Sequence, residues 1–559
     1  MSARSRSRVG RRAFVKAAAA GAAGLAMPWP LAAAAAGGEV LYNGIHLPHP
    51  WPPRLRSLPL DPTPPPYLLE PPPIIPIDLG RQLFVDDFLI QATSLTRTFH
   101  RAQYYEGSPV LRPTTLWERR DEYAERTKTR SNPAAMVFSD GVVFDPSDRL
   151  FKMWYMAGYR MHTCYATSHD GLTWERPALD VVKGTNIVSN EARDSNTVWL
   201  DHDEKNPARR FKMAAFKEHT LLLYSSPDGI HWTVQGESGP TVDRSTVFYN
   251  PFRRKWVYSL RDEQLGGFGR FRRYWEHDDL FEGAKWTADQ PVFWSGADSA
   301  EQRRPGYGTR PQLYNLDAVA YESVILGLFT IWRGETLSRE KPNDVCVGFS
   351  RDGFHWWRPD RQPFIPVSEQ VGAWNWANVQ TAGGCCLVVG DTLYFYVSGR
   401  TGVPGTQDPG TCSTGLATLR RDGFASMDVP DATTGPRLTS ASVNRGELLT
   451  RPVEFTGGHL FVNAELGDGS LRVAVEDAGG NVLPGFELGS CVAVRGNRTA
   501  MPVNWSAASL ARLAGKPVRL RFALTSGRLY AFWVPSAASG ASGGYVAAGG
   551  PAFNGPRDV

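Results

Sequence analysis

A seven-residue pattern, Ser-x-Asp-Gly-x-x-Trp, occurs three times in the chain and constrains the fold more than any other feature of the sequence. Copies begin at Ser168, Ser226 and Ser350, and a degraded copy, Arg421-Asp422-Gly423-Phe424, follows them. The Asp positions are 58, 124 and 70 residues apart, so the middle interval spans about two periods and one copy has decayed. Because Gly accepts positive φ, Asp-Gly is a strong tight-turn signal. We therefore interpret each copy as a structural hairpin turn.

Strand-like runs precede each turn, for example Gly141–Asp145 and Phe151–Tyr155 before the first copy. Long helical periodicity is scarce, so the fold class is all-β. Five units of four strands predict a five-bladed β-propeller over residues 79–438. The run Leu83–Ile90 is expected to complete the last blade and close the ring.

The remaining segments differ from the repeats in composition. Residues 439–535 alternate short strands with Gly-rich turns and predict a smaller β-sandwich. Residues 37–78 are Pro-rich, with thirteen prolines between positions 48 and 76, and predict an extended spacer. Residues 536–559 are rich in Gly, Ala and Ser and predict a flexible tail.

The first 36 residues have the three parts of an export signal. Arg11-Arg12 precedes an apolar run from Ala17 to Met27, and small residues near Ala34–Ala36 provide a cleavage region. This predicts a twin-arginine signal, with the export machinery as a partner and a periplasmic or extracellular location. The alternative is a basic tail followed by a short helix.

The net charge of +5 depends on this leader, which holds six basic residues and no acid. The rest of the chain is close to neutral. We therefore expect no nucleic-acid partner, because phosphate binding needs a basic surface. After the leader no apolar run is long enough to span a membrane.

The cysteines and histidines show no metal-binding spacing. The six cysteines are scattered without a C-x-x-C pair, and plain core packing is the expected role of Cys385 and Cys386. We expect no cofactor and no metal site. A structural cation at the propeller axis is compatible with the sequence, although nothing in it demands one.

The body of the chain, roughly residues 80–535, resembles glycoside-hydrolase-like proteins related to families 32, 43 and 68. The resemblance rests on Leu83–Ile90, Phe151–Tyr155, the repeated turns, and Val518–Phe522, which matches an appended sandwich. It implies three acids around the mouth of a propeller tunnel. One acid protonates the leaving oxygen, another attacks the sugar or activates water, and the third stabilises the oxocarbenium-like ring.

The family signatures do not map cleanly onto this sequence. Trp-x-Asn-Asp-Pro-Asn and Glu-Cys-Pro are absent, and Arg193-Asp194-Ser195 is the closest match to Arg-Asp-Pro. In a propeller, the entry ends of the inner strands face the pocket, so an acid just before an inner strand is a catalytic candidate. The alternative for each is a strand-edge, turn or salt-bridging acid. The catalytic candidates are Asp194, Asp243, Asp140, Asp317, Glu322 and Asp87.

Substrate contacts are expected from loops that enter the inner strands. Basic side chains bind sugar hydroxyls or carboxylates, and aromatic rings stack on sugar faces, although Trp also packs blades together. The substrate-binding candidates are Glu118, Arg130, Tyr307, Arg310, Trp374 and Trp376.

Together these patterns predict an exported hydrolase that cleaves glycosidic bonds of an oligo- or polysaccharide with carboxylates at the propeller centre. A non-catalytic glycan-binding propeller is the first alternative. A transferase, phosphorylase or lyase on the same scaffold is the second. The sugar, the linkage and the stereochemical outcome are not encoded in these patterns.

Overall fold

A computed structural model describes residues 38–128, 130–263, 268–430 and 445–559. Residues 39–559 form one compact unit. The predicted twin-arginine signal, residues 1–36, lies outside the described residues, and so does the expected domain boundary at residues 438 and 439.

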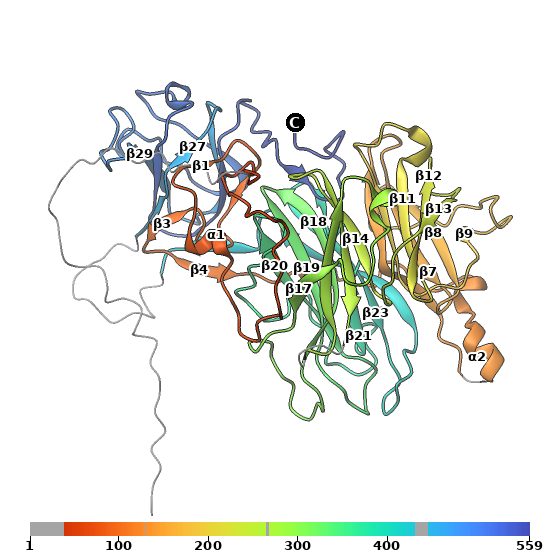
Figure 1. The fold of residues 1–559 in the computed structure, drawn as a ribbon. Helices are drawn as coiled ribbons and strands as arrows, with labels where there is room; N and C mark the ends of the chain where they lie inside the picture. Colours follow the sequence, from red (N-terminus) through yellow and green to blue (C-terminus); the bar gives the residue numbers. More distant parts are fainter. Residues whose placement is uncertain (1–37, 129, 264–267, 431–444) are drawn as a thin grey trace, which may run out of the picture. The chain divides into compact units, whose positions relative to one another are not determined.

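Five consecutive groups of antiparallel strands make up most of residues 134–420 (Figure 1). The first group contains β6 (Ala134–Asp145), β7 (Leu150–Ala157), β8 (His162–Ser168) and β9 (Ile187–Ser189). The second contains β10 (Asn196–Leu200), β11 (Phe211–Lys217), β12 (Thr220–Ser226) and β13 (Thr233–Glu237). The third contains β14 (Thr246–Asn250), β15 (Lys255–Asp262), β16 (Phe271–His277) and β17 (Val292–Gly296). The last two contain β18 (Gln312–Glu322), β19 (Val324–Trp332) and β20 (Asn343–Ser350); and β21 (Asn378–Thr381), β22 (Leu387–Val389), β23 (Thr392–Arg400) and β24 (Cys412–Arg420).

The groups are arranged as a β-propeller. Their first strands, β6, β10, β14, β18 and β21, contact one another in order, and β21 contacts β6 again. The ring is closed where β24 pairs in parallel with β6, with Cys412 opposite Ala134. Closure of this kind removes the bare sheet edges that would otherwise invite aggregation.

The repeated turns lie where the third strand of a group ends. In the second copy, Ser226 Oγ accepts from the Gly229 N–H at 2.9 Å, and Asp228 Oδ1 accepts from the N–H groups of Ile230 and His231 at 2.8 and 2.9 Å. Gly229 has a φ of +81°, which a side chain would strain. Equivalent contacts recur in the other two full copies, at Ser168, Asp170, Ser350 and Asp352. The prediction of tight structural turns is confirmed.

Two further sheets contain the C-terminal strands together with strands from the start of the chain. One sheet has the order β29 (Leu471–Glu476), β31 (Arg519–Leu524), β26 (Gly446–Thr450) and β3 (Ile90–Thr93). The other has the order β30 (Asn497–Val503), β28 (Leu460–Glu465), β32 (Arg528–Trp533), β25 (Ala425–Asp428) and β4 (Thr96–Phe99), with β2 (Gln82–Leu83) paired to β32. Side chains of both sheets, including Phe522 and Phe532, share one hydrophobic cluster.

The ring is not closed by Leu83–Ile90, so that prediction is wrong. Residues 82–99 pair with the C-terminal strands instead, and β5 (Gln103–Tyr104) is the N-terminal strand that pairs with β24. The Pro-rich residues 37–78, expected to form a spacer, contribute buried Leu41, Ile45 and Ile75 to the core of the two C-terminal sheets. There, β1 (Ile75–Pro76) pairs with β27 (Val453–Glu454).

The last residues also differ from the flexible tail that their composition predicts. Here β33 (Tyr545–Val546) pairs with β18 at Tyr321 and Glu322, and Val546 is fully buried. Small residues favour flexibility locally, but here they allow the chain to lie close against the propeller: a Cβ on Gly550 would clash with the Val388 carbonyl.

Helices are short throughout the described residues. They comprise α1 (Pro66–Leu69), α2 (Glu122–Thr127) and α3 (Leu280–Gly283), with 3-10 turns at Trp117–Arg119, Pro207–Arg209 and Leu510–Leu513. None of the described helices is long and apolar enough to cross a membrane.

Candidate active site at the propeller axis

A cavity of about 290 Å³ lies at the entry ends of the inner strands, and we call it the axial pocket. Met136 and Phe138 of β6 and Tyr314 of β18 contribute to its wall. Three carboxylates also line it: Asp194 before β10, Asp243 before β14, and Glu218 in the β11–β12 turn. The remaining lining residues are Met156, Tyr159, Arg160, Phe216, His219, Val242, Lys341 and Arg400.

Asp194 and Asp243 each have an arginine partner at this pocket. Arg160 Nη2 lies 3.0 Å from Asp194 Oδ2, whereas Asp194 Oδ1 is buried and has no hydrogen-bond partner in the described part of the chain. Arg261 forms an ion pair with Asp243, whose side chain is 31% exposed. The structure therefore brings the two leading candidates together, each beside a compensating charge.

Tyr314 lies among the cationic groups of the pocket. Burial alone would raise its pKa, but the positive charges of Lys341, Arg400 and Arg244 lower it overall. Arg400 is itself buried and donates from Nη1 to Glu340 Oε1 at 2.9 Å. The pocket therefore combines carboxylates with positively charged groups.

Asp140 and Asp317 are buried and are not among the residues that line the axial pocket. Asp140 accepts two hydrogen bonds from Arg193, with Nη2 3.0 Å from Oδ2. Asp317 Oδ2 accepts from Asn315 Nδ2 at 2.7 Å, and also from Ser139 and Thr381. Burial raises the pKa of both acids, despite the opposing effect of these donors.

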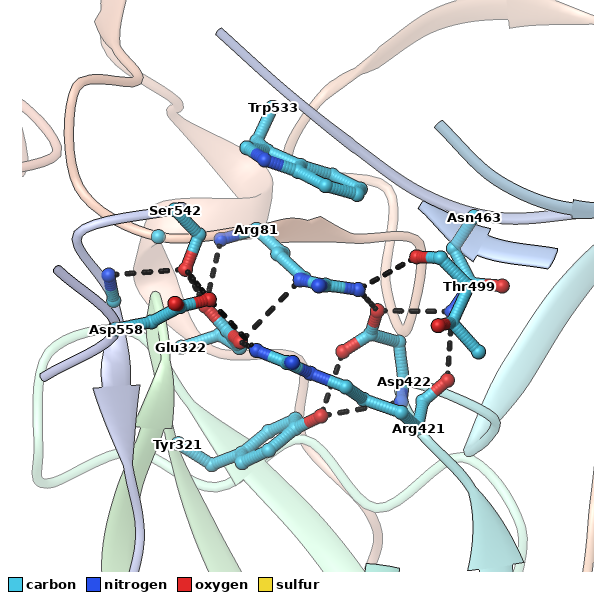
Figure 2. Close-up of polar contacts among 12 residues, drawn as sticks. Arg81, Tyr321, Glu322, Arg421, Asp422, Asn463, Thr499, Trp533, Ser542 and Asp558 are labelled. Carbon is cyan, nitrogen blue, oxygen red and sulfur yellow. Dashed lines mark hydrogen bonds and ion pairs between the residues drawn. The ribbon is translucent and has the colours of Figure 1, made fainter. Parts of the chain in front are cut away.

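Glu322 lies at the far end of β18 in a buried charge cluster (Figure 2). Figure 2 shows Arg81 between the carboxylates of Glu322 and Asp422. The guanidinium carbon of Arg81 lies 4.1 Å from the centroid of the Trp533 ring. Glu322 accepts from Arg421 Nη2 at 2.9 Å and from Ser542 Oγ at 2.7 Å. With its oxygens engaged and the side chain fully buried, this geometry supports a structural role.

Asp87 and Glu118 also lie away from the axial pocket. Asp87 is 69% exposed and pairs with Arg97 at 2.5 Å. Glu118 is fully buried and accepts from Tyr155 Oη and Arg176 Nε, each at 2.7 Å. Burial opposes its ionisation, but the Arg176 hydrogen bond and charge lower the Glu118 pKa overall.

The other substrate-binding candidates are likewise not among the residues that line the axial pocket. Trp374 packs edge-on against Tyr104, with ring centroids 5.6 Å apart, and it covers two glycines of β23 and β24. Trp376 is buried beside Arg339. Arg130 is exposed, whereas Tyr307 and Arg310 are half-buried.

Several polar residues of the pocket were not selected from the sequence, among them Glu218, His219, Tyr314, Lys341 and Arg400. Glu218 has a φ of +56° in a two-residue hairpin turn. An acid at such a position is typical of an ordinary turn, so the sequence does not mark it as a site residue. Tyr314 lies near the start of the inner strand β18. A search for aromatic residues, and not only acids, at the entry ends of the inner strands would therefore have found it. His219 lies in the same turn as Glu218. Lys341 precedes β20 and Arg400 ends β23, and their approach to the propeller axis depends on tertiary structure.

A second cavity of about 280 Å³ lies at the exit ends of the inner strands. Leu200 and Asp203 of the second group line it together with Tyr545, Ala547 and Ala548 from the C-terminal segment. Ala548 O accepts from the Phe144 N–H at 2.9 Å, which fixes the segment against β6. The C-terminal residues therefore form part of the wall at this end of the axis.

Among the described residues, no group of three or more His, Cys, Asp or Glu side chains is arranged to hold a metal ion. The six cysteines are buried and free.

No protein-family model and no curated protein matches the chain. Solved structures similar to it include an N-acetylgalactosamine deacetylase from F. plautii in complex with blood group B trisaccharide, at 14% identity and a TM-score of 0.41, covering 58% of this chain and 96% of that one. A thermostable family-43 glycoside hydrolase is similar at 13% identity and a TM-score of 0.38, covering 56% and 100%. A fructofuranosidase from Schwanniomyces occidentalis complexed with fructose is similar at 13% identity and a TM-score of 0.33, covering 71% and 96%.

Proposed function

We propose that the protein is an exported carbohydrate-active hydrolase that cleaves glycosidic bonds in the axial pocket. The observation that carries this proposal is the presence of Asp194, Asp243 and Glu218 in the lining of one cavity. Glycoside hydrolysis needs at least two carboxyl groups, one to protonate the leaving oxygen and one to attack the sugar or activate water. A cavity of about 290 Å³ suits a terminal sugar unit better than a long chain segment.

The local charges suggest a division of roles. Asp194 and Asp243 each form an ion pair with an arginine at the pocket, and we assign to them the roles of nucleophile and general base. Glu218 is exposed at the pocket rim, and no ion pair of Glu218 is found among the described residues. It is therefore the carboxyl group best placed to exchange a proton with a leaving group.

Single Asp194→Asn and Asp243→Asn variants test this assignment. Each should lower kcat on a cleaved glycan by about 100-fold or more, with thermal unfolding unchanged, because amides neither attack nor accept a proton. Asp203→Asn, in the cavity at the other end of the axis, is the matched control and should keep full turnover. Full turnover by both pocket variants would exclude these roles.

Glu218→Gln tests the proposed proton donor separately. A general acid works only while protonated, so its loss should remove the basic limb of the pH–rate profile and leave the acidic limb in place. Binding of glycans without any sugar release would instead assign the protein as a glycan-binding propeller. Release that depends on phosphate, or that leaves an unsaturated product, would assign a phosphorylase or a lyase.

Export rests on the leader sequence alone. Fusion of residues 1–36 to a reporter should carry it out of the cytoplasm, and Arg11→Lys with Arg12→Lys should stop this. A reporter that leaves equally well with both lysines would contradict the twin-arginine route.

A further inference from the structure

The charged groups of the axial pocket are unequally paired. Asp194 pairs with Arg160, Asp243 with Arg261, and Arg400 with Glu340. Lys341 also lines the pocket, and no ion pair of Lys341 is found among the described residues. Glu218, which is exposed at the rim, likewise has no ion pair among the residues that the structure describes.

A second cation, the guanidinium of Arg244, lies behind the pocket wall and has no hydrogen-bond partner among the described residues. Arg244 is fully buried, and in the described part of the chain none of its three guanidinium nitrogens has a hydrogen-bond partner. Its guanidinium carbon lies 3.8 Å from the Phe138 ring centroid and 6.0 Å from that of Tyr314, and both rings line the pocket. Arg400 approaches the same Phe138 ring at 5.3 Å. Two guanidinium groups therefore surround one ring of the pocket wall.

This arrangement is costly unless something compensates it. A buried charge without a hydrogen-bonded partner loses its hydration, which destabilises the fold. Arg244 also has a φ of +62°, a region that non-glycine residues rarely adopt. Backbone strain of this kind concentrates at functional sites, and an anion held in the pocket would offset the positive charge behind its wall.

We propose that the axial pocket binds an anionic sugar unit, with the carboxylate of a uronate or a sulfate ester seated between Lys341 and Arg400, on the side of the pocket backed by Arg244. The inference rests on the proposed function, since it names the substrate class of the same pocket. Lys341 supplies the positive charge without an ion pair, Arg400 contributes guanidinium donors beside its ion pair with Glu340, and Arg244 adds a positive potential through the wall. The low dielectric of the interior strengthens that potential.

Calorimetric titration of the full chain tests the proposal with defined probes. Glucuronate and galacturonate represent the carboxylate, galactose 6-sulfate represents the sulfate ester, and glucose and galactose are the neutral references. At least one anion should bind about tenfold more tightly than its neutral counterpart, and raising the salt concentration should weaken it. Comparison of the uronates with the sulfate identifies the anion. Equal binding of neutral and anionic sugars would overturn the proposal.

Three variants identify the source of the selectivity. Lys341→Met should lower the affinity for the anion about tenfold without changing thermal unfolding, whereas Lys183→Met, at an exposed lysine outside the pocket lining, should have no effect. Arg244→Met should weaken anion binding while the unfolding temperature stays level or rises, because an unpaired buried charge is removed. Unchanged anion affinity in Lys341→Met would overturn the proposal even if Arg244→Met failed to fold.

The outcomes separate this inference from the proposed function. Cleavage of neutral glycans that depends on Asp194, without any preference for anions, would remove the inference and keep the hydrolase. Selective anion binding without cleavage would keep the inference and remove the hydrolase.

Discussion

Aspartate residues have three different roles in this protein, and the neighbours of each residue determine its role. Asp228 accepts local backbone N–H groups and shapes a turn, Asp422 pairs with a buried arginine, and Asp194 lines the axial pocket. The turn role was predictable because its partners lie within three residues. The role of Asp422 was not, since Arg81 lies 341 residues away in the sequence.

Asp228→Ala should destabilise the protein, because it removes the acceptor of two backbone N–H groups at the second turn. A lost turn or cap interaction of this kind costs about 0.5–2 kcal/mol. Chemical denaturation at neutral pH measures this loss. Asp289→Ala, at an exposed acid, is the control and should leave the free energy of unfolding nearly unchanged.

The same aspartate gives a pH-dependent signature. Burial opposes its ionisation, but the hydrogen bonds from His231, Ile230 and Ser226 prevail and lower the pKa of Asp228 to about 2. A lowered carboxyl pKa stabilises the fold above the ordinary aspartate pKa, and this contribution is lost as the pH falls toward 2. The stability difference between wild type and Asp228→Ala should therefore shrink between pH 4 and pH 2. A constant difference would contradict this account.

At the scale of elements, strands and turns followed from local patterns, whereas their partners did not. Alternating apolar residues and Asp-Gly turns predicted the propeller strands correctly. The sequence of Leu83–Ile90 predicts a strand but not its partner, because any open sheet edge could pair with it. In the structure this segment pairs with strands of the C-terminal sheets. The final residues read as a tail because nothing in their composition indicates that they pack on β18.

Truncation before Gly543 should therefore destabilise the propeller. It removes β33 and exposes the surface now covered by Val546 and Phe553, two largely buried side chains. Burial of a Val and a Phe contributes about 3–6 kcal/mol in total. Thermal unfolding should show a clear loss for this truncation and none on deletion of Val559, which is 94% exposed. Equal stability of the two truncated chains would show that the segment is dispensable.

At the scale of the whole molecule, one buried cluster links the propeller to the C-terminal sheets. Arg81 precedes β2 and donates to Asp422 Oδ2 at 2.9 Å and to the Thr499 carbonyl at 2.7 Å. Asp422 belongs to the degraded fourth repeat. In this copy Arg420 occupies the position of the serine, and Arg421 lies between it and Asp422. The degraded copy therefore makes contacts beyond the propeller, and the intact third copy does so as well, through the ion pair of Arg351 with Asp86.

Arg81→Ala should cost about 3–5 kcal/mol, because it leaves Asp422 and Glu322 buried with less compensation. Lys285→Ala breaks an exposed pair with Glu282 and should cost less than about 1 kcal/mol. Denaturant unfolding compares the two variants. If Arg81→Ala were as mild as the control, the cluster would not hold the two parts of the fold together.

The central claim is that carboxylates gathered at the propeller axis cut a glycosidic bond. Chromatography of the sugars released from neutral and acidic glycans, by wild type and by the Asp194→Asn/Asp243→Asn double variant, tests it most directly. The account predicts product from the wild type and none above background from a double variant that unfolds at the same temperature. Equal release by both proteins, or no release from any glycan by the wild type, would contradict it.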